Sequence, residues 1–111
     1  MPHNARPVHE VKANLFRVLG HPARVRILEL LRDGERSVGR LQAALELDSS
    51  GTSQHLAALR RIGFVESRRD GTSVLYRVAD PEVFELLEVA RGIILRQLAE
   101  QQTLLQELET S

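Results

Sequence analysis

The stretch that decides the fold is LELDSSGTSQHLAALRRIGFV at residues 45–65, followed directly by ESRRDGTSVLYRV at 66–78. Its first half predicts a turn, Leu47-Asp48-Ser49-Ser50, and then a helix that runs to Ile62 and is ended by Gly63. Residues that fall on one side of this helix, and should be buried, are Thr52, Leu56, Leu59 and Ile62. The other side carries Ser, Gln and His, whose polar groups suit the edges of DNA bases. The helix is therefore predicted to read DNA.

The second half of the stretch predicts a basic hairpin. Strand patterns at 65–69 and 73–78 are joined through Asp70-Gly71, a strong turn signal. Arg68 and Arg69 lie in the first of these strands, where guanidinium groups can contact phosphate.

Charge is segregated along the chain, although the net charge is zero. Residues 49–79 hold five arginines and two acidic residues, whereas residues 80–111 hold two arginines and seven acidic residues. The positive part thus coincides with the predicted reading helix and hairpin. An ordinary mixed surface is the alternative interpretation.

Length and composition predict one globular domain spanning 1–111. The chain has 42% hydrophobic and 27% charged residues, and no cysteine. Lack of cysteine excludes disulfides and thiolate chemistry within the chain. Because no apolar run approaches the ~18 residues of a membrane span and no signal peptide opens the sequence, we expect a cytoplasmic protein without membrane contact.

The remaining pattern is mainly helical. Residues 1–7 predict a flexible arm, and helices are expected at 8–19 and 23–32, from an N-cap at Ser37 to about Ala44, and from Pro81 to about Leu108. The 81–108 helix is apolar on more than one side, which predicts burial against a second copy. We expect a homodimer through the first and last helices.

In this order and spacing, several motifs together carry a resemblance to a known family. They are LGHPARVRIL at 19–28, SQHLAAL at 53–59, GFV at 63–65, and RRDG at 68–71 leading to Tyr76-Arg77. The chain resembles the ArsR/SmtB family of winged helix-turn-helix transcriptional regulators over about residues 8–98.

The resemblance implies a mainly α fold with a small β-hairpin wing. It also implies a homodimer on an inverted-repeat operator in double-stranded DNA, and usually repression relieved by an inducing ion. The helix after Asp48 would enter the major groove. DNA-binding candidates are Ser49, Ser50, Gly51, Thr52, Ser53, Gln54, His55, Arg60, Arg68 and Arg69. For His55, a structural or phosphate hydrogen bond is favoured over base reading.

The chain departs from the family's usual metal sites. Where some members carry Cys-Val-Cys, this sequence has Ser37-Val38-Gly39. Where others place Asp-x-His and a later His pair on the last helix, it has Asp80-Pro81-Glu82, with the later positions at about Ile93 and Arg96. Neither site is intact.

A different metal site remains open. His3 and His9 lie in or near the N-terminal arm, and the last helix supplies Glu82. Imidazole and carboxylate without sulfur favour nickel, cobalt or zinc over thiophilic metals. The alternative is that these histidines bind nothing.

These features predict a dimeric DNA-binding regulator, responsive to a borderline divalent metal. The alternative is an effector-free DNA-binding or interaction module whose C-terminal helix docks a protein co-regulator. No pairing of nucleophile and base and no phosphate-cradling glycine loop is recognisable, so an enzyme is not expected.

Overall fold

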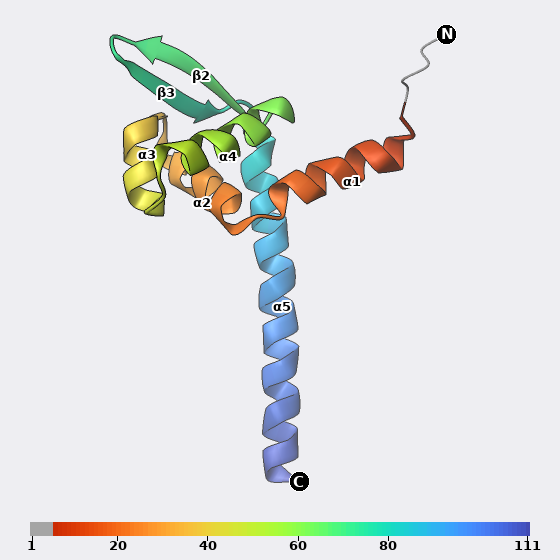
Figure 1. Ribbon diagram of the computed structural model, residues 1–111. Coiled ribbons are helices and arrows are strands. Elements are labelled where there is room, and N and C mark those ends of the chain that lie inside the picture. Colours follow the sequence, from red (N-terminus) through yellow and green to blue (C-terminus); the bar gives the residue numbers. More distant parts are fainter. Residues whose placement is uncertain (1–5) are drawn as a thin grey trace. The chain divides into compact units, whose positions relative to one another are not determined.

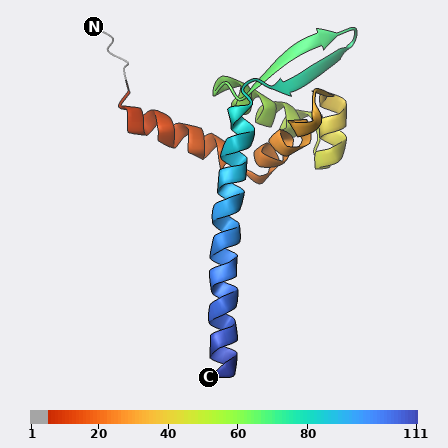
Figure 2. The same cartoon turned by 180° about the vertical axis from the view of Figure 1, so that it is seen from behind.

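The computed structural model describes residues 6–111, which form two compact units, one ending at Asp80 and one formed by residues 81–111. Figures 1 and 2 show the chain from opposite sides. The first unit contains α1 (Val8–Leu19), α2 (Pro22–Leu30), the 3-10 turn η1 (Leu31–Asp33), β1 (Arg36–Ser37), α3 (Val38–Leu45), α4 (Ser49–Arg61), β2 (Val65–Asp70) and β3 (Ser73–Val78). The second unit is one helix, α5 (Glu82–Thr110). The expected fold, mainly helical with a hairpin wing, is confirmed.

Helix ends follow from local chemistry. The Ser37 hydroxyl accepts from the Arg40 amide at 3.2 Å, which is the expected cap of α3. At the start of α2, His21 Nδ1 accepts from the Ala23 amide at 3.1 Å, and Pro22 occupies the first helical position. Expected to reach Arg32, α2 instead ends at Leu30 and tightens into η1, as helix ends often do.

The end of α3 was not foreseen from the sequence. Glu46 adopts the left-handed conformation with φ 55°, where glycine or asparagine would be usual. It is the one non-glycine residue with positive φ among residues 6–111. This turn leads the chain from α3 to Asp48, the residue that begins α4.

The sheet has three antiparallel strands in the order β1-β3-β2. The expected hairpin is present, but Asp70 still pairs with Ser73, so the two loop residues are Gly71 and Thr72 rather than Asp70-Gly71. Gly71 has φ 63°, which the first position of a tight type II′ turn requires. The third strand, β1, is two residues long and too short to produce a pattern in the sequence.

The core of the first unit lies where α4 contacts α2, α3 and β2. Its fully or nearly fully buried side chains are Ile27, Leu28, Leu31, Leu41, Thr52, Leu56, Leu59 and Val65. Burying a leucine or isoleucine contributes roughly 1.5–3 kcal/mol each. The hairpin β2–β3 projects from α3 and α4 (Figure 1), and its tip residues are exposed.

Candidate DNA-binding surface

The N-terminal end of α4 is held by Asp48. Its carboxylate accepts from the Gly51 amide at 2.7 Å, and its carbonyl accepts from the Thr52 amide at 3.1 Å. A Cβ on residue 51 would lie 3.0 Å from Asp48 Oδ1, tighter than ordinary contact. Gly51 therefore leaves room for the cap, a role that the sequence pattern did not reveal.

Four polar side chains project from this first stretch of α4. Ser49, Ser50, Ser53 and Gln54 are all exposed. Hydroxyls can both donate and accept, and an amide can form a bidentate pair with an adenine edge. These four are the candidates that the first stretch of α4 leaves accessible for base or phosphate contact.

Thr52 was predicted from the sequence to be a DNA-binding residue, and the structure shows that this prediction is wrong. Its side chain is fully buried, and its hydroxyl donates to the Asp48 carbonyl at 2.9 Å. A side chain in the core cannot reach DNA, so Thr52 supports α4 from within. Its place in the inward row of the helix was the sequence signal for this role.

His55 forms a small cluster with residues of α2. Its Nδ1 accepts from Arg24 Nε at 3.2 Å, and its ring lies 4.3 Å, centre to centre, from the ring of His21. Burial lowers the pKa of His55, and the charges of His21 and Arg24 lower it further. A lowered pKa favours the neutral ring, whose Nδ1 can accept the hydrogen bond from Arg24. His55 thus links α4 to α2, in line with the structural role favoured from the sequence.

The wing arginines differ in their pairing. Arg68 donates from Nε and Nη2 to the two carboxylate oxygens of Glu35, at 2.8 and 2.7 Å. This hydrogen bonding lowers the pKa of the Glu35 carboxyl and raises the pKa of Arg68. Arg77 likewise donates to Glu66, at 2.6 Å. Pairing compensates these charges, and the partner of Arg68 lies 33 positions away, beyond the reach of any local pattern.

Arg60 and Arg69, by contrast, are exposed at the end of α4 and on β2. Within residues 6–111 neither forms an ion pair. Their charge is available to phosphate without first breaking a salt bridge.

The structure describes only two of the three residues expected to bind metal. His3 lies outside the described residues, His9 is exposed on α1, and Glu82 begins α5 in the other unit. Among residues 6–111, no three His, Asp or Glu side chains gather closely enough to hold a metal ion.

No helix within residues 6–111 combines the length and apolarity needed to cross a membrane.

A capped helix with exposed polar side chains at its start, beside a hairpin on which Arg69 forms no ion pair within residues 6–111, defines a winged helix-turn-helix DNA-binding regulator. Residues 21–67 match the family described as bacterial regulatory protein, arsR family. The chain is 47% identical to the HTH-type transcriptional regulator Rv0081 of Mycobacterium tuberculosis, covering 92% of this chain and 90% of that protein. The chain belongs to the ArsR family, whose members are transcriptional regulators and not enzymes.

Solved structures agree with this assignment. The crystal structure of Rv0081 superimposes with a TM-score of 0.82, covering 87% of this chain and 98% of that one. A homodimeric winged helix-turn-helix DNA-binding domain, Mb0332 from Mycobacterium bovis, has a TM-score of 0.71 at 32% identity, covering 78% and 81%. The probable mercury resistance operon repressor of Streptomyces lividans is 34% identical over 74% of this chain and 66% of its own length.

Proposed function

We propose that this regulator binds an inverted-repeat operator as a homodimer, with α4 in the major groove and the β2–β3 wing against phosphate. The observation that carries the proposal is the exposed polar row of Ser49, Ser50, Ser53 and Gln54 at the capped start of α4. A two-fold dimer places two such helices on the two halves of a palindrome. We expect the protein to act in the cytoplasm, and to repress transcription in the absence of its inducer.

Dimer formation is supported by exposed apolar side chains on both terminal helices. On α1 they include Val8, Val11 and Phe16, and on α5 they are Val89, Ile93, Ile94, Leu95, Leu98, Leu104, Leu105 and Leu108. An apolar row of this length on a separate helix calls for a partner surface. The homodimer described for Mb0332 supports a second copy of this chain as that partner.

Phosphate contact by the wing is testable through salt dependence. We expect Arg69→Ala to reduce the slope of log K against log salt by about 1.8, the value for two released counterions, because the dimer loses one contact in each copy. Arg68→Ala should reduce the slope less, because Glu35 already neutralises that guanidinium in the free protein.

The measurement is operator binding by fluorescence anisotropy between low and moderate salt. Arg91→Ala, on α5, is the control and should leave the slope unchanged. An unchanged slope for both Arg69→Ala and Arg68→Ala would exclude the wing arginines from the phosphate contacts.

We further propose a metal response through nitrogen and oxygen ligands, with His3, His9 and Glu82 as ligands for nickel, cobalt or zinc. Support comes from the chemistry of the donors: the chain has no thiolate, and borderline metals accept imidazole and carboxylate. A relative named for mercury resistance also supports metal sensing in the family, although thiophilic mercury has no cysteine to bind here.

Calorimetric titration with each metal tests this response. The His3→Ala/His9→Ala double variant should lose binding, and Glu82→Gln should weaken it. Glu109→Gln, at the far end of α5, is the control. Wild-type binding should also weaken below about pH 6, because imidazole must be neutral to ligate and its ordinary pKa is ~6.5. Unchanged nickel and zinc affinity in the double variant would remove both histidines from the site.

The alternative function is an effector-free module whose α5 docks a protein co-regulator. The exposed apolar row of α5 is the observation that favours it. It predicts operator binding that no metal alters, together with an α5 surface still exposed in the dimer. Hydrogen exchange of α5 at micromolar concentration separates the two functions, since α5 buried on both sides leaves no docking surface.

A further inference from the structure

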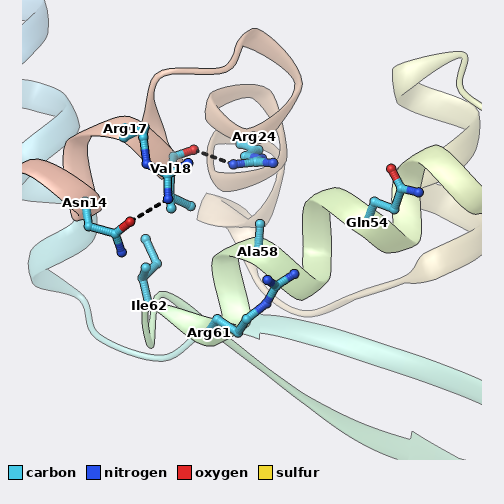
Figure 3. Close-up of a pocket in the computed structure, with 8 residues that line it drawn as sticks. All are labelled: Asn14, Arg17, Val18, Arg24, Gln54, Ala58, Arg61 and Ile62. Carbon is cyan, nitrogen blue, oxygen red and sulfur yellow. Dashed lines mark hydrogen bonds between the residues drawn. The ribbon is translucent and has the colours of Figure 1, made fainter. Parts of the chain in front are cut away.

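A pocket of about 380 Å³ lies between α1, α2 and α4. Three of its lining residues are arginines, one from each helix: Arg17, Arg24 and Arg61 (Figure 3). Asn14 and Gln54 add polar groups, and no acidic residue lines it. Its volume falls within the range of small-molecule sites, about 300–1,000 Å³.

All three guanidinium groups are positioned by neutral acceptors. Arg17 donates to the Asn14 amide oxygen at 2.6 Å, and Arg24 donates to the Val18 carbonyl at 3.0 Å and to His55. Arg61 donates to the Ala57 carbonyl at 3.3 Å. These bonds orient the side chains without neutralising their charge.

Three other arginines of the same unit form ion pairs, unlike the pocket arginines. Arg26, Arg68 and Arg77 each lie within ion-pair distance of a glutamate. Within residues 6–111, none of the three pocket arginines has such a partner. The first unit thus concentrates uncompensated positive charge in one concave place.

Each guanidinium has five N–H groups, of which the neutral acceptors occupy only one or two. The remaining donors can engage a multiply charged oxyanion, and arginine favours phosphate because its fork matches two oxygens at once. We propose that this pocket is a binding site for a phosphate group.

The phosphate has two possible sources, a free phosphorylated small molecule and the DNA backbone. Gln54 contributes both to the exposed row of α4 and to the pocket lining, so either source would act next to the reading helix. The two sources are distinguished by testing the protein with and without DNA.

In the first arm, the full chain without DNA is titrated with pyrophosphate by calorimetry at low salt. Arg17→Gln and Arg61→Gln should each weaken binding about tenfold, the worth of one charge-assisted hydrogen bond. Arg24 is left intact because it also ties α1 and α4 to α2. Arg40→Gln, which removes an exposed unpaired arginine of α3 outside the pocket, is the matched control and should change affinity less than twofold.

In the second arm, the same variants bind operator DNA across a range of salt. If pyrophosphate does not bind but Arg17→Gln and Arg61→Gln each lower the salt slope by about 1.8, one contact in each copy of the dimer, the pocket takes a backbone phosphate. In that case Arg17→Lys should keep the wild-type salt slope, because lysine retains the charge. If the pocket binds pyrophosphate instead, Arg17→Lys should weaken that binding, because lysine loses the planar fork. The proposal is overturned if Arg17→Gln and Arg61→Gln behave like Arg40→Gln in both pyrophosphate affinity and salt slope. If these variants at the same time bind the operator as tightly as the wild-type protein does, the proposed DNA-binding function is unaffected by that failure.

Discussion

Ile94→Asp is expected to convert the dimer into monomers at micromolar concentration. Ile94 is 54% exposed in the single chain and belongs to the apolar row of α5. Placing a carboxylate in an apolar interface costs several kcal/mol unless it gains a partner. A loss of 3 kcal/mol or more would correspond to an increase in the dissociation constant of roughly a hundredfold or more.

Thr103→Asp provides the matched control. It introduces the same charge nine residues further along α5, which is about 180° around a helix of 3.6 residues per turn. Thr103 is exposed, and its hydroxyl donates to the Ala99 carbonyl of its own helix. Sedimentation velocity should give a dimer for Thr103→Asp and a monomer for Ile94→Asp. Equal behaviour of the two would mean that the row containing Ile94 does not form the interface.

Operator affinity should fall together with the dimer in Ile94→Asp. Each monomer still carries α4 and the wing, but it engages one half-site and loses the gain from two linked contacts. A monomeric variant with undiminished affinity would show that a single copy is the binding unit.

Gln54→Ala is expected to relax base preference at one position of each half-site. Gln54 is exposed near the start of α4, and a bidentate amide–adenine pair discriminates against the wrong base by about 1–3 kcal/mol. The ratio of affinities between the preferred operator and the operator substituted at that position should therefore shrink by roughly tenfold or more in Gln54→Ala.

Binding of Gln54→Ala to a set of operators substituted one base pair at a time measures this effect. Gln106→Ala, on the exposed surface of α5, is the control. The salt slope should remain unchanged in both variants, because neither removes a charge. If every operator weakens by the same factor in Gln54→Ala, Gln54 contacts the backbone and reads no base.

The sequence by itself was sufficient for features that depend on neighbouring residues. The inward spacing of Thr52, Leu56, Leu59 and Ile62 predicted the buried side of α4. The first three are buried, whereas Ile62 follows the last residue of the helix and is half-buried. The two strand patterns predicted the hairpin, whose turn is displaced by a single residue. Such features follow from helical and strand periods, which repeat within a few residues and can be read along the chain.

The tertiary structure alone decided which charges remain available. Glu35 and Arg68 are 33 positions apart, and they form a salt bridge. Of the neighbouring Arg68 and Arg69, only Arg69 therefore keeps an uncompensated charge. The same holds for the pocket, because Arg17, Arg24 and Arg61 come from three helices and converge only when these pack together. Periodicity records which side of an element is apolar, but the partner of a charge depends on the distance between elements in space, and no local pattern encodes that distance.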